Sequence, residues 1–129
     1  MRRGIRSRWL AAFLLLGATA AMAENPSVPF SDQVFAVAQA QERRVVVETY
    51  APWCLPCRIQ SPILERLHSQ AEFRDLVILR IEEGTPKAVW RRFKLHGYGN
   101  LIVFKGSSET ARGTPTSEPA AAALLRTAR

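Results

Sequence analysis

The sequence has few cysteines and histidines, and it contains no internal repeat. Its 129 residues hold two cysteines, Cys54 and Cys57, and two histidines, His68 and His96. A structural zinc site takes four ligands, so a zinc site within one chain would need all four of these side chains. A disulfide between cysteines this close together closes a very short loop and removes little entropy from the unfolded chain. A metal site and a structural disulfide remain as alternatives to a redox role.

Long hydrophobic runs are also lacking, apart from an uncharged stretch over residues 9–23. As a helix this stretch would span about 22 Å at ~1.5 Å per residue, short of a hydrocarbon core of ~30 Å. Four arginines precede an apolar centre over residues 10–20, and Ala21-Met22-Ala23 forms a small-residue cleavage site. This organisation predicts a signal peptide over residues 1–23, cleaved after Ala23, and no stable membrane anchor after cleavage.

The positive charge of the chain is partly a property of this leader. The whole sequence has a formal net charge of +7, but residues 1–23 hold four arginines and no acidic residue. Residues 24–129 therefore carry 14 basic and 11 acidic side chains, a net charge of +3. Because the basic residues are scattered, no nucleic-acid partner is expected. The 106 residues that remain suit one domain with a single core.

The two cysteines lie in the run Trp53-Cys54-Leu55-Pro56-Cys57, between a β-branched stretch and a helical pattern. A turn of this kind puts the first sulfur at a helix N-terminus, where free backbone N–H groups and the helix dipole favour a thiolate. Cys54 is therefore the expected nucleophile, and Cys57 is the expected resolving thiol. The favoured interpretation is a reversible dithiol/disulfide.

The hydrophobic pattern predicts eight elements in the order α, β, α, β, α, β, β, α. Such an order predicts a small α/β sandwich, with helices on both faces of a mixed sheet. Residues 24–30 are expected to be an extended lead-in. Pro62 is expected to kink the second helix, because proline supplies no N–H. The expected elements are residues 31–42, 44–50, 57–71, 76–81, a helix from Thr85, 101–104, 109–112 and a helix from Ser117 to Leu125.

These residues resemble a thioredoxin over about residues 31–128. The resemblance is carried by the strand over residues 45–50, the Trp-Cys-Leu-Pro-Cys motif, the helix with Pro62 and the strand over residues 101–104 with the Lys-Gly that follows it. It implies a thioredoxin fold with a sheet of about four strands flanked by helices. It also implies thiol–disulfide exchange without a cofactor beyond the Cys54–Cys57 disulfide.

The resemblance further implies protein thiol or disulfide substrates and a redox donor or oxidant protein as partners. With a signal peptide, the expected location is the periplasm or an equivalent exported space. Reduction of protein disulfides is the favoured direction, because the motif is thioredoxin-like and the large inserted helical domain usual in oxidases is lacking. A monomer is expected.

Two departures from the family lie near the cysteines. Leu55 makes the turn bulkier and more apolar than the Gly-Pro of cytosolic thioredoxins. Glu48 takes the place of a buried aspartate, and the resemblance implies that it exchanges a proton with Cys57, directly or through water. The alternative is a carboxylate at the strand end that faces solvent. Ile78 takes the place of a basic residue that often accompanies the aspartate, so Glu48 is expected to lack a nearby cation.

The third departure is Gly99, which falls at the position of a cis-proline opposite the cysteines. A cis bond before any other residue costs about 2.5–4 kcal/mol, so a trans or mobile loop is expected. The resemblance implies substrate-binding roles for Gly99 and for three further residues, Trp53, Pro56 and Tyr98. Loss of the proline also leaves an alternative function, a binding or assembly module that holds a metal or iron–sulfur cluster through Cys54 and Cys57, shared between two chains.

Overall fold

A five-stranded mixed sheet forms the centre of the structure, a computed structural model that describes residues 25–129. The strands lie in the order β1-β3-β2-β4-β5. β1 and β2 both run parallel to β3, whereas β4 runs antiparallel to β2 and β5. Their bounds are β1 Ser27–Pro29, β2 Arg44–Thr49, β3 Val77–Ile81, β4 Leu101–Lys105 and β5 Ser108–Gly113.

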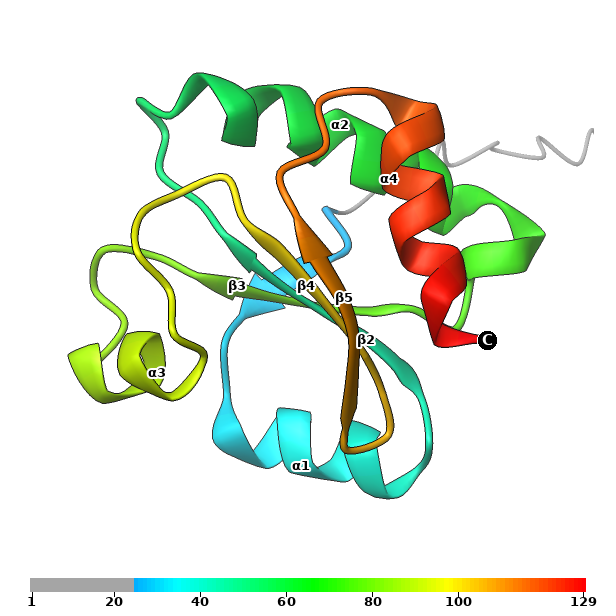
Figure 1. The fold of residues 1–129 in the computed structure, drawn as a ribbon, viewed down its shortest axis with the longest axis horizontal. Helices are drawn as coiled ribbons and strands as arrows, with labels where there is room; N and C mark the ends of the chain where they lie inside the picture. The colour runs from blue at the N-terminus through cyan, green and yellow to red at the C-terminus, as the bar shows by residue number, and fades with distance from the viewer. Residues whose placement is uncertain (1–24) are drawn as a thin grey trace, which may run out of the picture.

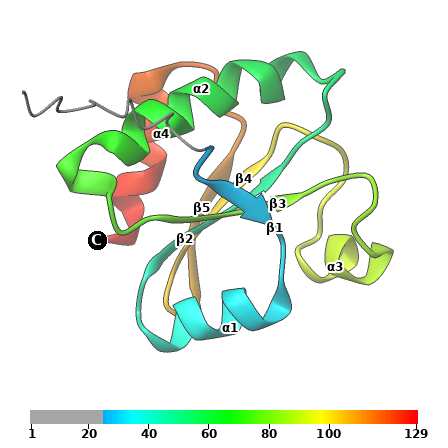
Figure 2. The same cartoon turned by 180° about the vertical axis from the view of Figure 1, so that it is seen from behind.

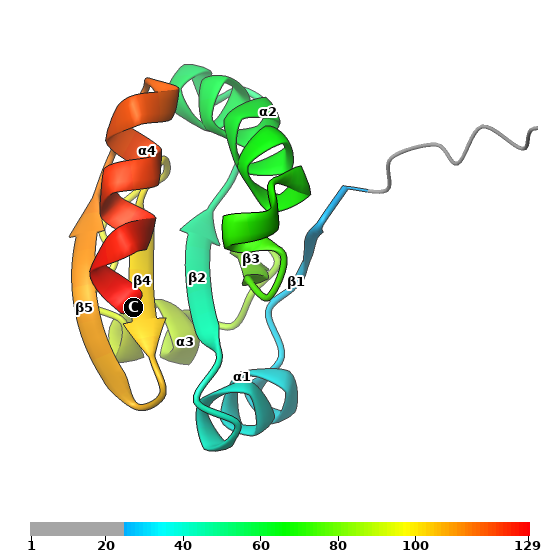
Figure 3. The same cartoon turned by 90° about the vertical axis from the view of Figure 1, so that its right-hand side faces the viewer.

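Helices cover both faces of this sheet (Figure 1). α2 and α4 pack over one face, and α1 and α3 pack on the other side. In Figure 3, α4 lies in front of the strands and α3 lies behind them. Each face has its own hydrophobic cluster, because alternate residues of a strand point in opposite directions. The helices are α1 Asp32–Ala40, α2 Leu55–Ser69, α3 Lys87–Arg92 and α4 Glu118–Leu125, with the 3-10 helices η1 Ala71–Phe73 and η2 Arg126–Ala128.

The central strand β2 places the cysteine motif. Val45, Val46 and Val47 are fully buried. Val46 belongs to the cluster under α2 and α4, and its two neighbours belong to the cluster beside α1 and α3. β2 is thus buried on both faces, and it leads directly into the turn that carries the cysteines.

The predicted α/β sandwich is confirmed, with three differences in detail. The lead-in contains a fifth strand, β1, which pairs with β3 at the edge of the sheet (Figure 2). α2 begins at Leu55 rather than at Cys57. α3 begins at Lys87, because the Thr85 hydroxyl accepts a hydrogen bond from the backbone N–H of Glu82 instead of capping the helix.

The predicted signal peptide lies outside the described residues and stays a prediction. Among residues 25–129, no helix is long and apolar enough to cross a membrane.

Candidate active site

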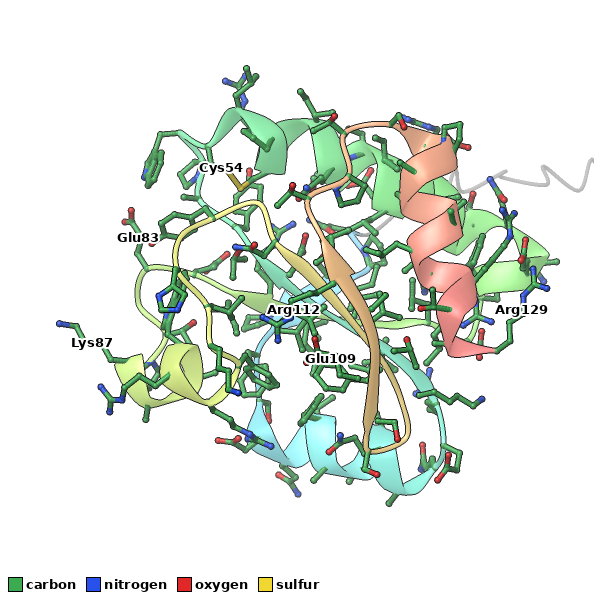
Figure 4. All side chains as sticks on the ribbon, in the orientation of Figure 1. Cys54, Glu83, Lys87, Glu109, Arg112 and Arg129 are labelled. Atoms are coloured by element: carbon green, nitrogen blue, oxygen red, sulfur yellow. A yellow bond between two sulfur atoms is a disulfide. The ribbon has the colours of Figure 1, made fainter. Side chains whose placement is uncertain are left out.

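Cys54 and Cys57 form a disulfide at the N-terminus of α2 (Figure 4). Their Cα atoms are 5.3 Å apart. Cys54 is the N-cap residue of the helix, and its Sγ accepts a hydrogen bond from the backbone N–H of Cys57 at 3.3 Å. The sulfur therefore lies where unpaired N–H groups and the positive end of the helix dipole stabilise a negative charge.

The two cysteines differ in their exposure to solvent. Cys54 is 6% exposed and Cys57 is 1% exposed. The Sγ of Cys57 lies 3.4 Å from the backbone carbonyl oxygen of Thr49 at the end of β2. An incoming group therefore meets Cys54 first, while Cys57 stays close behind it.

Trp53 forms an exposed wall beside the disulfide. Its side chain is 66% exposed, and its Nε1–H donates to a Glu83 carboxylate oxygen at 2.9 Å. The indole contacts the Tyr98 ring edge to face at 5.0 Å between centroids, and Tyr98 contacts Trp90 in the same way at 5.2 Å. We call Trp53, Tyr98 and Trp90 the aromatic row. Burial and the Glu83 carboxylate raise the pKa of Tyr98, so its hydroxyl stays protonated.

Gly99 lies close to the disulfide. A Cβ at this position would lie 3.2 Å from Cβ of Pro56 and 3.8 Å from Sγ of Cys54. Its φ of +86° lies in the region that favours glycine. No peptide bond among residues 25–129 is cis, which agrees with the expected trans loop. The structure thus brings Gly99, Pro56 and Cys54 together.

Hydrogen bonds hold the Gly99 loop from both sides. The Gly99 N–H donates to the carbonyl of Thr49 at 3.0 Å, and the Gly99 carbonyl accepts from the side-chain amide of Gln60 at 2.8 Å. The backbone N–H of Asn100 donates to the Thr49 hydroxyl at 2.9 Å. Gln60 is 2% exposed and lies on the buried face of α2. Sequence reasoning missed Gln60, although a polar residue in an apolar helical stripe was a visible signal.

Glu48 is buried, and its carboxylate has a cation beside it. One Glu48 oxygen accepts a hydrogen bond from Nε of Arg80 at 2.8 Å. The same guanidinium donates to the Ser61 hydroxyl at 3.2 Å and lies 3.9 Å from the centroid of the Tyr50 ring. The alternative of a carboxylate facing solvent is therefore wrong.

The expectation that Glu48 lacks a nearby cation is also wrong. Arg80 lies directly opposite Glu48 in the parallel register of β2 and β3. Because side chains alternate along a strand, Arg80 points to the same face as Ile78, the residue that takes the place of the family's basic side chain. The cation is thus supplied two positions further along β3.

Ligands for a metal within one chain are not gathered anywhere in the described part of the sequence. Residues 25–129 contain no group of three or more His, Cys, Asp or Glu side chains that would hold a metal ion. A metal or cluster bound by Cys54 and Cys57 would therefore need ligands from a second chain.

A dithiol at a helix N-terminus, next to the central strand of a mixed sheet, defines a thiol:disulfide oxidoreductase site. The sequence model of the family described as Thioredoxin matches residues 26–126. The chain belongs to the thioredoxin family, it has the thioredoxin fold, and it is a thiol:disulfide oxidoreductase.

Sequence and structure comparisons with individual proteins support this assignment. Thioredoxin-1 of Saccharomyces cerevisiae is 32% identical over 78 residues, which are 60% of this chain and 74% of the yeast protein. Protein disulfide-isomerase erp38 of Neurospora crassa is 35% identical over 66 residues, which are 50% of this chain but 18% of that larger protein. The crystal structure of Trxlp from Edwardsiella tarda EIB202 superposes with a TM-score of 0.72 at 33% identity, covering 77% of this chain and 97% of that one.

Replacing Gln60 tests the hydrogen bonds that hold the loop. Gln60→Leu keeps the size of the side chain but leaves the Gly99 carbonyl without its donor, which costs about 1–3 kcal/mol for a buried group. We expect this loss of unfolding free energy in urea titration, with faster amide exchange at Gly99 and Asn100. The exposed substitution Gln33→Leu should change stability by no more than about 0.5 kcal/mol. Equal stability of Gln60→Leu and wild type would contradict this account.

Replacing Arg80 tests the buried ion pair. Arg80→Met leaves Glu48 as a buried charge without its partner, and we expect a loss of about 3–5 kcal/mol of unfolding free energy at neutral pH. Adding Glu48→Gln to Arg80→Met should recover most of this loss, because the uncompensated charge is removed. The matched control is Arg92→Met, which breaks the exposed pair with Asp32 and should cost no more than about 1 kcal/mol. Additive effects of the two buried substitutions would show that the pair is not coupled.

Proposed function

We propose that the protein is an exported oxidoreductase that reduces disulfides in other proteins, with Cys54 as the attacking thiol and Cys57 as the resolving thiol. The observation that carries this proposal is the position of Cys54. Its sulfur caps α2, and Cys54 is the more exposed of the two cysteines. No cofactor beyond the dithiol is required.

In the proposed reaction, the Cys54 thiolate attacks one sulfur of a substrate disulfide. A bond forms between Cys54 and the substrate, and the other substrate sulfur leaves as a thiolate that takes a proton from solvent. Cys57 then loses its proton and attacks Sγ of Cys54, which releases the second substrate thiolate. The substrate gains two electrons, the protein is left with its disulfide, and a donor protein restores the dithiol.

Glu48 is proposed to accept the proton of Cys57, directly or through one water. It precedes Thr49, whose carbonyl oxygen lies 3.4 Å from the Cys57 sulfur. In the reduced protein this carbonyl can accept a hydrogen bond from the Cys57 thiol. The Arg80 guanidinium donates to one oxygen of Glu48 and so fixes the position of the carboxylate.

The surface around Cys54 supports binding of an unfolded or extended substrate segment. Trp53 and Leu55 flank the sulfur and are largely exposed, and Ile59 follows one turn later on α2. Tyr98, Gly99 and Pro56 complete the proposed substrate-binding residues.

The proposal also covers location and partners. The leader over residues 1–23 supports export to the periplasm with cleavage after Ala23, which leaves no stable membrane anchor. The partners are then protein disulfides and a redox donor or oxidant protein of the same compartment. The protein acts as a monomer and binds no nucleic acid.

Cysteine variants test the chemistry. In dithiothreitol-coupled reduction of insulin, Cys54→Ser should lose all activity over background, because the attacking sulfur is gone. Cys57→Ser should lose turnover but accumulate a mixed disulfide with its substrate, visible by mass spectrometry. The exposed substitution Val34→Ala should behave like wild type. Metal analysis of the same sample gives the competing outcome, since stoichiometric metal or iron–sulfur cluster without insulin reduction would favour the assembly module.

Export is tested in a Gram-negative host that expresses the full chain. The protein should appear in the periplasmic fraction with Glu24 as its first residue. Leu14→Arg places a charge in the apolar centre of the leader and should leave the uncleaved precursor in the cytoplasm, whereas Leu14→Ile should not. Uncleaved, membrane-bound wild-type protein would contradict cleavage after Ala23.

A further inference from the structure

A hollow of about 370 Å³ lies beside α3, next to the candidate active site. Trp90 and Leu95 supply its apolar lining. The other lining side chains are three cations and one histidine. We call the hollow and its lining the basic groove. Its lining residues are Lys87, Trp90, Arg91, Lys94, Leu95 and His96.

The cations of the groove form no salt bridge in the described structure, although Lys94 lies near the Glu109 carboxylate. Within residues 25–129, no salt bridge includes Lys87, Arg91 or Lys94. In contrast, the neighbouring Arg92 pairs with Asp32. Lys87 projects from α3 away from the body of the domain (Figure 4). The groove thus presents positive charge to an incoming molecule.

Two acidic residues precede α3 and reduce this charge without cancelling it. Glu82 and Glu83 are exposed beside the groove. One Glu83 oxygen is occupied by the indole N–H of Trp53. The carboxylate therefore helps to fix the wall of the active site. A third acidic residue, Glu109, lies near Lys94 and pairs with Arg112. Four cations thus stand against three acidic residues, and the region keeps a net positive charge.

The aromatic row connects the groove to the disulfide. Trp53 lies beside Cys54, Tyr98 contacts Trp53, and Trp90 lines the groove and contacts Tyr98. The two centroid distances, 5.0 and 5.2 Å, limit the span of the row to about 10 Å, the length of about three residues of extended chain at ~3.3 Å per residue. A polypeptide whose cysteine has reached Cys54 can therefore place side chains three or four positions away in the groove.

We propose that the basic groove binds acidic side chains of the substrate polypeptide, three or four residues from its reacting cysteine. This inference rests on the proposed function and names the substrate class for the same site. Carboxylates would meet the cations of Lys87, Arg91 and Lys94, while the aliphatic parts of the peptide contact Trp90. Charge complementarity of this kind raises the rate of association, and salt weakens it.

Peptides activated as mixed disulfides with 2-thiopyridine test the proposal on the reduced full-length protein. Attack by Cys54 on the peptide sulfur joins the two and releases 2-thiopyridone, which is followed by absorbance. The peptides carry one of three dipeptides, Asp-Glu, Asn-Gln or Lys-Lys, at the positions three and four residues from the cysteine. Each dipeptide is placed before the cysteine in one peptide and after it in another. We expect one acidic peptide to react about tenfold faster than its amide counterpart at low salt, and this ratio should fall toward one at high salt, where the Debye length is ~3 Å.

Charge reversal distinguishes the groove from the overall charge of the protein. Lys87→Glu with Arg91→Glu should invert the order of rates, so that the lysine peptide reacts faster than the acidic peptide, an outcome that requires folded and active protein. Arg43→Glu with Arg74→Glu makes the same change in net charge. These arginines are exposed and precede β2 and β3, so they lie at the end of the sheet opposite Cys54, and the acidic preference should persist.

Equal rates for acidic and amide peptides would overturn the inference while leaving the proposed function intact. An acidic preference that survives in the groove variant, or that disappears in the Arg43 and Arg74 variant, would overturn it as well, because the preference would then come from the total charge. If none of the peptides reacts with the wild-type protein, both the proposed function and this inference fail.

Discussion

The reactive sulfur depends on the junction between β2 and α2. β2 is the central strand of the sheet and is buried on both faces, so its C-terminal end is fixed by packing from two hydrophobic clusters. Because α2 begins at the next residue after Cys54, the sulfur takes the capping position that a serine or aspartate oxygen often takes. The stability of the core and the electrostatics of the thiolate therefore come from the same stretch of chain.

The loop that faces the sulfur is held by hydrogen bonds rather than by a proline ring. Gly99 lets the backbone approach Pro56 and Cys54 closely, but glycine alone would leave the loop conformationally free. Gln60 and Thr49 restrict it by binding the Gly99 carbonyl and N–H. Since Gln60 follows Cys57 by one helical turn, the helix that carries Cys57 also positions the opposite loop.

Local sequence patterns were sufficient to predict the strongly periodic helices and strands and to find the cysteine motif. They failed where a strand or a side chain depends on a partner distant in sequence. β1 has three residues and ends in proline at a sheet edge, so it shows no alternation that would predict a strand. Arg80 lies beside Glu48 because the parallel pairing of β2 and β3 brings together two residues that α2 separates in the sequence. Likewise, the position of Gln60 in a buried stripe was readable, but its partner lies 39 positions away.

Charged groups at this site lie in two different environments, one buried and one exposed. Their effects should therefore differ in how strongly they depend on salt concentration. The Glu48–Arg80 pair is buried, so salt screens it weakly, and in the proposed mechanism Glu48 acts on the proton of Cys57. The cations beside α3 are exposed, so they act over the distance at which a partner approaches and are screened by salt. In the proposed reaction, salt should therefore slow the encounter with the substrate and leave the rate of the resolving step unchanged. The aromatic row joins the two regions, because Trp53 and Trp90 contact the same tyrosine.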